Sequence, residues 1–281
     1  MFEAVMRHET LLQRLLVQPA RSDELATDLE TSRSTIHRWL SALQRDGLVE
    51  QVDGRYRLTL TGTLALTEFE RLLQQLETIV AARDILRSIP DDTAIDPSLF
   101  VGATVVLGDR SRTKSTSGSI PPIEPREAFR ALLETGTHLR GVAPGLNEEV
   151  IAAVQDALSS GPESDERIEL AIAVPHDTVE TLLTTFREPT AAALETGRLT
   201  LCETTAPLPY GLLVLERDGR DVSGEVDLDI GSGPITALVV CDETGIRGLL
   251  VTDDSDALEW ATETLADVWV DSEPLSTLGD R

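Results

Sequence analysis

The spacing of apolar residues changes abruptly at Gly47, and this change constrains the fold of the N-terminal quarter more than any other feature. Before Gly47, apolar residues recur three and four positions apart, as they do on the buried face of a helix. After it, two short apolar segments flank Asp53-Gly54, a dipeptide that strongly favours a two-residue β-hairpin turn. The sequence therefore predicts helices followed directly by a hairpin.

The N-terminal quarter contains three predicted helices and two predicted strands. The helices cover residues 4–17, 22–29 and 33–46, and the strands cover 48–52 and 55–60. Ser22 is the expected N-cap of the second helix, and Ser32 or Arg33 that of the third. This order of elements predicts a winged helix-turn-helix domain in residues 1–62.

Four sequence segments of this region are similar to those of a known protein family. The region contains Ser-Asp-Glu-Leu-Ala, then Ser-Arg-Ser-Thr-Ile-His-Arg-Trp-Leu, then Leu-Gln-Arg-Asp-Gly-Leu-Val and finally Tyr-Arg-Leu-Thr. In this order the segments resemble those of archaeal and bacterial winged-helix transcription regulators. The resemblance implies binding to double-stranded DNA, with the third helix in the major groove.

The outward side chains of the third helix and of the hairpin are the candidate DNA contacts. Arginine can read guanine through its two-pronged guanidinium group, and hydroxyl groups suit phosphates or bases. The candidates are Arg33, Ser34, Thr35, His37, Arg38 and Ser41 on the helix and Arg55, Tyr56 and Arg57 on the hairpin. Two alternatives remain, a solvated helix face with incidental arginines and a winged helix used only for protein contacts.

The charge of the chain is uneven. The formal net charge is −25, and 23 of the 24 basic residues are arginine. Residues 1–66 hold nine acids and eight arginines (net −1), whereas residues 67–281 hold forty acids and sixteen bases (net −24). Such acid-rich, lysine-poor composition resembles that of proteins from salt-loving archaea, in whose cytoplasm a Debye length of ~3 Å screens self-repulsion. The alternative is an acidic mesophile protein with an anionic tail, but the carboxylates are spread along the chain.

A connecting helix is predicted over residues 64–87, within a segment bounded as 63–89. Its apolar residues follow a 3-4 spacing at Phe69, Leu72, Leu76, Ile79 and Leu86. This spacing predicts the seam of a homodimer that sets two wings at half-site spacing. The alternative is a helix packed on its own C-terminal domain.

Residues 90–271 are predicted to form a mixed-sheet α/β domain, followed by a tail over 272–281, so the whole chain is of the α+β class. The predicted helices cover 125–135, 147–159, 177–196 and 255–266, and the predicted strands cover 137–142, 167–174, 198–204, 210–216, 235–241 and 246–251. A polar segment over about 108–125 reads as a loop.

The element order and the segment Leu-Pro-Tyr-Gly-Leu-Leu-Val-Leu resemble the effector domain of archaeal methanogenesis (filament) regulators. They are also similar to a single lobe of the phospholipase D fold. Phospholipase D chemistry needs a His-x-Lys pair, and the one lysine, Lys114, follows Arg112 instead. The chain also lacks Gly-x-Ser-x-Gly, a phosphate-binding loop and paired metal-binding cysteines. No catalytic residue, cofactor or metal is expected, and Cys202 and Cys241 are predicted to be small buried apolar residues.

The sequence thus predicts a cytoplasmic, haloarchaeal DNA-binding transcription regulator. Its partners would be double-stranded DNA, a second copy of itself, and an unknown small-molecule or protein effector sensed by the C-terminal domain. No apolar segment approaches the ~18 residues of a membrane span. The alternative is a scaffold or enzyme that does not bind DNA. The sequence does not identify the effector or the target genes, nor whether the protein activates or represses them.

Overall fold

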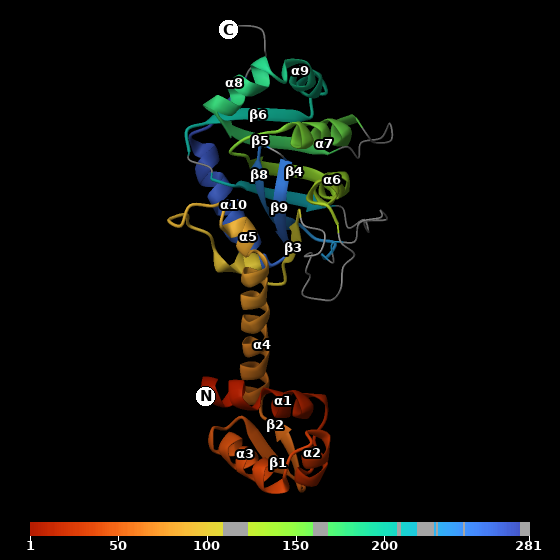
Figure 1. Cartoon of the computed structure of the whole chain (residues 1–281), viewed down its shortest axis with the longest axis vertical. Coiled ribbons are helices and arrows are strands. Elements are labelled where there is room, and N and C mark those ends of the chain that lie inside the picture. The colour runs from red at the N-terminus through yellow and green to blue at the C-terminus, as the bar shows by residue number, and fades with distance from the viewer. Residues whose placement is uncertain are drawn as a thin grey trace. The chain divides into compact units, whose positions relative to one another are not determined.

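The computed structural model describes residues 1–108, 123–159, 168–206, 209–217, 228, 230–243 and 245–275. The chain forms two compact units, Met1–Gln74 and Gln75–Arg281 (Figure 1). The boundary between the units lies within one long helix, α4, over Leu60–Ala81. No helix of these residues is long and apolar enough to cross a bilayer.

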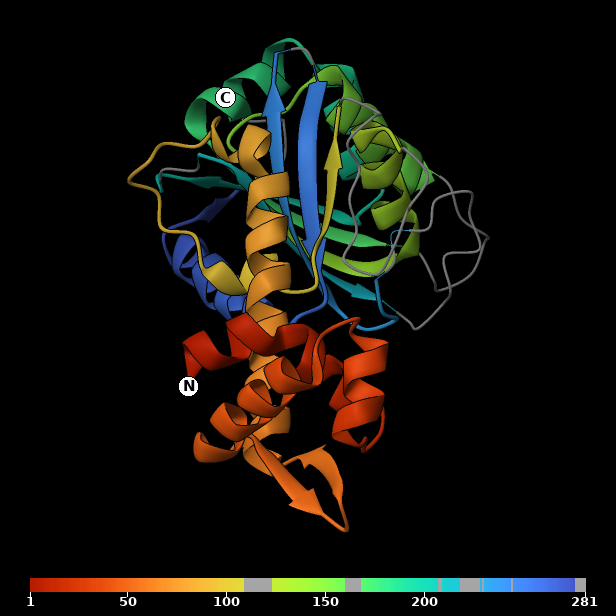
Figure 2. The ribbon, with the colours of Figure 1, turned by 60° about the horizontal axis from the view of Figure 1, so that its bottom comes forward.

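The first unit is a winged helix-turn-helix. Its elements are α1 (Phe2–Val17), α2 (Ser22–Asp28), α3 (Arg33–Arg45), β1 (Val49–Val52), β2 (Arg55–Leu58) and the start of α4. The antiparallel hairpin β1–β2 projects from the helices (Figure 2). Large side chains of all three helices form its core, namely Leu11, Leu12, Leu25, Ile36, Leu40 and Leu43. The predicted order of three helices and a hairpin is confirmed.

Local signals explain where these elements begin and end. The Ser32 hydroxyl accepts a hydrogen bond from the Thr35 N–H (3.2 Å), which caps α3. Gly47, with φ +74°, ends that helix, and Asp53 and Gly54 both have positive φ in the hairpin turn.

The predicted cap of the second helix is wrong. Arg21 is the N-cap of α2, and Ser22 is its first residue. The carboxylate of Glu24, the third residue of the helix, accepts a hydrogen bond from the N–H of the cap residue Arg21 (2.8 Å).

The predicted continuous helix over 64–87 is also corrected. α4 begins earlier, at Leu60, and ends at Ala81, and a separate short helix α5 follows over Arg83–Leu86. The two helices meet at Ala82 (φ −76°, ψ −2°), a fully buried residue that packs into the core of the second unit.

In its described residues, the second unit is built on a mixed sheet of eight strands in the order β10-β6-β5-β4-β7-β8-β9-β3. The strands are β3 (Thr104–Leu107), β4 (Gly136–Val142), β5 (Glu169–Pro175), β6 (Leu199–Thr204), β7 (Gly211–Arg217), β8 (Ile235–Asp242), β9 (Gly245–Thr252) and β10 (Glu273–Pro274). Strands β4, β5 and β6 pair in parallel, and the other neighbours are antiparallel. The predicted mixed-sheet α/β architecture is confirmed, whereas β3 and β10 had no counterpart in the prediction.

Helices cover both faces of the sheet. One face packs against α6 (Pro125–Thr135), α7 (Glu148–Ser159), α8 (His176–Thr184) and α9 (Arg187–Glu195). The other packs against α5, the 3-10 helix η1 (Pro97–Phe100) and α10 (Ser255–Val270), and Figure 1 shows α6 and α10 on opposite sides. The predicted single helix over 177–196 is two helices, because Pro189, in the first turn of α9, has no N–H to donate to the preceding turn.

Candidate nucleic-acid interface

The outer face of α3 presents arginine and polar side chains to solvent. Its inner face is anchored by Ile36, Leu40 and Leu43, whose side chains are buried in the first unit. The exposed side chains on the opposite face are Arg33, Ser34, His37, Arg38 and Ser41. The structure thus brings five of the six candidates on this helix together on one surface, and Thr35 is half-buried beside them.

The hydroxyl groups of this helix have local hydrogen bonds. The Thr35 and Ser34 hydroxyls lie 2.8 Å and 3.0 Å from that of Ser32, and the Ser41 hydroxyl donates to the His37 carbonyl (2.8 Å). Arg33 and Arg38, in contrast, form no ion pair with any side chain in the described part of the chain. The guanidinium groups of Arg33 and Arg38 can therefore donate hydrogen bonds to an external acceptor such as a phosphate or a base edge.

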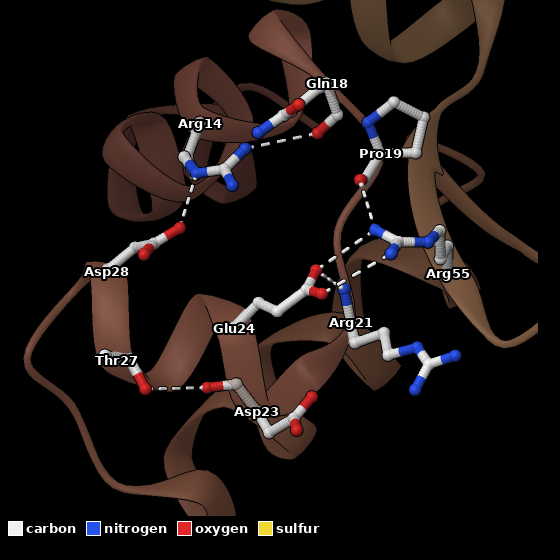
Figure 3. Close-up of polar contacts among 9 residues, drawn as sticks. All are labelled: Arg14, Gln18, Pro19, Arg21, Asp23, Glu24, Thr27, Asp28 and Arg55. Carbon is white, nitrogen blue, oxygen red and sulfur yellow. Dashed lines mark hydrogen bonds and ion pairs between the residues drawn. The ribbon is translucent and has the colours of Figure 1, made fainter.

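The two wing arginines form ion pairs with glutamates. The Arg55 guanidinium donates to the Glu24 carboxylate (3.1 Å) and to the Pro19 carbonyl (3.1 Å), as Figure 3 shows. Arg57 pairs with Glu50, directly opposite on β1, at 2.7 Å. Both pairs are exposed, and exposed pairs contribute only about 0–1 kcal/mol, so a phosphate can replace either glutamate at small cost.

Tyr56 is not a surface contact, which corrects the prediction. It is 8% exposed and belongs to the core of the first unit. Its backbone N–H donates to the Ala20 carbonyl (2.8 Å) and its carbonyl accepts from the Ala20 N–H (3.0 Å). Strand alternation already places Tyr56 opposite the two arginines, so its role is to anchor the hairpin to the chain after α1.

Two further arginines flank this surface and were missed by the sequence reasoning. Arg45 lies exposed in the last turn of α3, and Arg21 is exposed at the start of α2. The Arg21 guanidinium points away from Glu24 (Figure 3). Their positions at the end of one helix and the cap of another are the signals that could have found them.

One buried histidine lies under α3. Burial lowers the pKa of His8, and the charges of Arg7 and Arg38 lower it further. The imidazole is therefore held neutral beneath the arginine-bearing helix, and His8 adds no charge to the candidate interface.

Three of the five residues of the predicted dimer seam, Phe69, Ile79 and Leu86, pack within their own chain, which corrects the prediction for them. Phe69 is buried in the first unit, where its ring contacts that of Phe2 edge-on (5.8 Å between centroids). Ile79 and Leu86 pack on the core of the second unit, as the alternative interpretation expected. Leu72 and Leu76 stay 38% and 48% exposed, and Val80, four residues further, is 60% exposed. These three exposed apolar residues, Leu72, Leu76 and Val80, form the exposed stripe of α4.

The two cysteines of the second unit have raised thiol pKa values. Burial raises the pKa of the Cys202 thiol, and burial with the nearby Asp242 and Glu149 raises that of Cys241 to about 11, so both thiols stay protonated. No group of three or more His, Cys, Asp or Glu in the described ranges could hold a metal ion. Lys114 and Arg112, and most of the predicted loop, fall in 109–122, outside those ranges.

Two family profiles match separate parts of the chain. Residues 2–81 match the HVO_A0261 N-terminal domain. Residues 122–271, more than half of the chain, match the middle domain of the methanogenesis regulatory protein FilR1. No curated protein sequence matches the chain.

Several solved structures are similar at low identity. Nuc, a phospholipase D family member from Salmonella typhimurium, is 12% identical, with 62% of this chain and 98% of Nuc covered and a TM-score of 0.38. IclR of Thermotoga maritima is 14% identical, with 95% and 96% covered and a TM-score of 0.23. HmgR of Pseudomonas aeruginosa is 14% identical, with 95% and 97% covered and a TM-score of 0.24. At these TM-scores the three structures carry no argument about function.

Proposed function

The chain belongs to the family defined by the middle domain of the methanogenesis regulatory protein FilR1, and we propose that it is a transcription regulator that binds double-stranded DNA. One observation carries this proposal. The outer face of α3 exposes Arg33 and Arg38 without carboxylate partners among the described side chains, in a chain whose net charge is −25. In such an acidic protein, an arginine-bearing recognition helix next to an exposed hairpin fits the phosphates and base edges of a DNA major groove.

The roles of the candidate residues follow from their positions. Arg38, in the middle of the exposed face, reads a base edge, while Arg33 at the start of α3 binds phosphate. Arg55 and Arg57 exchange their glutamate partners for the DNA backbone beside the groove. The protein therefore works in the cytoplasm, where the DNA is, and it acts by binding rather than by catalysis.

A second copy of the chain completes the proposal. The exposed stripe of α4 is apolar along i, i+4 positions, a spacing that suits pairing with the same helix of another copy. A homodimer presents two α3 helices to two half-sites one or more helical turns apart. An effector bound by the second unit would favour one placement of the two wings and so change operator affinity.

DNA binding is tested by fluorescence anisotropy with the DNA upstream of the protein's own gene and with a scrambled duplex of the same composition. The double variant R33A/R38A removes the two arginines in the first two turns of α3, neither of which has an ion-pair partner among the described side chains. The double variant R126A/R130A is the matched control, because it removes two arginines of α6 in the second unit. We expect the first to abolish tight binding and the second to preserve it. Equal binding by both variants, or none by the wild type at any salt concentration, would instead favour the scaffold alternative.

A further inference from the structure

A groove of about 400 Å³ crosses one face of the sheet in the second unit. Its floor is made by the amino-terminal halves of β4, β5 and β6 together with the end of β7, and its wall by Thr262 and Leu265 of α10. Figure 1 shows α10 alongside these strands. All elements of the groove belong to the second unit, and all of its lining residues are described.

Arg140 stands in the floor of this groove among small side chains. On β4 it lies directly opposite Ala171 of β5 and Val214 of β7, and Ala171 lies opposite Thr200 of β6. Residues directly opposite in a sheet project from the same face. The guanidinium group therefore rises from a floor of short side chains, which leaves room for a ligand next to it.

The Arg140 side chain is held in place but not neutralised. Its guanidinium carbon lies 4.8 Å from the centre of the Trp269 ring, a cation–π contact that fixes the side chain against α10. It forms no ion pair with any carboxylate of the described residues. Arg140 is exposed, so its unpaired N–H groups can meet a ligand in the groove, whereas the Trp269 indole N–H is a buried donor without an acceptor among these residues.

The other end of the groove carries negatively charged side chains. His138, two residues before Arg140 on β4, lies between Glu169 (3.5 Å) and Glu216 (3.6 Å). These two carboxylates repel an anion from that end, whereas Arg140 attracts one at its own end. The groove is lined by Arg140 and Arg198 as well as by these two carboxylates, so an anion is drawn toward Arg140 and away from Glu169 and Glu216.

The larger groove of the second unit has the wrong charge for an anion. It lies between α6, α7 and the turn after β8 and is lined by two arginines and by five carboxylates, those of Glu127, Glu148, Glu149, Asp156 and Glu243. Of the two grooves, the one around Arg140 is the better electrostatic match for a negatively charged ligand.

We propose that the Arg140 groove binds a small organic carboxylate. The carboxylate accepts hydrogen bonds from Arg140, and a flat or apolar body lies over Ala171 and Val214 and against Leu265. A fork of N–H donors facing a planar carboxylate is the geometry that arginine favours. This inference deepens the proposed function, on which it rests only in identifying the ligand as the effector of the regulator.

Binding is measured first without DNA, on the full chain, by ligand-observed NMR titration at fixed KCl concentration. The probe is benzoate, and benzamide, which has the same shape without the charge, is its control. We expect saturable binding of benzoate and binding of benzamide weaker by about tenfold or more, because a hydrogen bond between ions is lost. Equal affinities of the two compounds would overturn the proposal.

Two variants locate the site. R140Q should weaken benzoate binding by about ten- to hundredfold, whereas R130Q, which removes an exposed arginine of α6, should leave it unchanged. A171L keeps the charge of Arg140 but fills the floor beside it, and it should also abolish binding. Circular dichroism checks that each variant is folded. Benzoate affinity that R140Q and A171L both leave unchanged would overturn the site.

A last measurement separates this inference from the proposed function. Benzoate is added to the complex of the protein with its own upstream DNA, and anisotropy reports a change in affinity that R140Q should abolish. Benzoate binding without DNA binding would uphold the groove and reject the regulator. DNA binding without benzoate binding would do the reverse.

Discussion

The rings of His8 on α1 and Trp39 on α3 lie 5.2 Å apart, centroid to centroid, and join the first helix of the chain to the arginine-bearing helix. His8 is buried, its Nδ1 has no hydrogen-bond partner in the part of the chain described, and its backbone (φ −122°) interrupts the regular geometry of α1. The position of α3 therefore depends on a histidine that is neutral in the folded state.

This contact predicts that the first unit loses stability in mild acid. The pKa of His8 is lowered, mainly by burial, from the ordinary value of 6.5. Well above pH 6.5 the residue is neutral whether folded or unfolded, so it contributes no pH dependence there. Below pH 6.5 the unfolded chain binds the proton first, and the free energy of unfolding falls as the pH drops toward the folded pKa.

Denaturant unfolding at pH 5.5 and 7.5 measures this effect. Trp39 alone reports it when Trp260 and Trp269 are replaced by phenylalanine. H8F should reduce the difference between the two pH values, whereas H37F, which changes an exposed histidine of α3, should not. The same pH dependence in H8F and the parent protein would show that His8 is not responsible.

Arg38→Ala should weaken operator binding by about 1–3 kcal/mol and relax sequence specificity, because it removes a base contact. The side chain is exposed, so thermal unfolding should hardly change. Competition titrations with single-base operator variants measure both effects. An unchanged binding isotherm at working salt would remove Arg38 from the interface.

Glu24→Gln should strengthen DNA binding. It frees Arg55 from its ion pair, so the arginine reaches phosphate without first breaking a contact worth about 0.2–1 kcal/mol. The glutamine carbonyl can still accept the Arg21 N–H, which preserves the start of α2. D23N, on the same helix but without a contact to Arg55, is the control for general charge. If D23N raises affinity as much as E24Q, the ion pair has no specific role.

Leu76→Glu should split the dimer. Leu76 is 48% exposed in the single chain, so the charge costs little in a monomer but much in a seam where two copies of α4 meet. Light scattering should report a monomer that loses tight binding to an operator with two half-sites. V270E, at an 80% exposed valine of α10, should leave the assembly intact. A dimer that persists in L76E would place the interface elsewhere.

DNA affinity of the full chain should pass through a maximum as salt rises. Each phosphate contact adds a slope of ~−0.9 to the plot of log affinity against log salt concentration. The net charge of −24 on residues 67–281, however, repels DNA most strongly in dilute buffer. Residues 1–74, with nine bases and eleven acids, should instead weaken steadily. Anisotropy titrations from dilute to molar KCl test both. A monotonic fall for the full chain would contradict the halophile interpretation.

The sequence alone determined the local structure of the first unit. Asp53-Gly54 and Gly47 set the turn and the helix end because positive φ is a property of one or two residues. The inward stripe of Ile36, Leu40 and Leu43 likewise determined which face of α3 carries its arginines. These features depend on neighbours in the chain, and a sequence pattern records such neighbours directly.

The tertiary structure decided what the apolar stripes contact. The 3-4 spacing of α4 is the same whether a residue meets a second copy or its own chain, so only the fold could show that Phe69 is already buried and that Ile79 already packs on its own chain. The pairing of Arg55 with Glu24, and the meeting of Arg140 with Trp269, join residues far apart in sequence. No local pattern encodes such contacts, because they depend on how whole elements pack together.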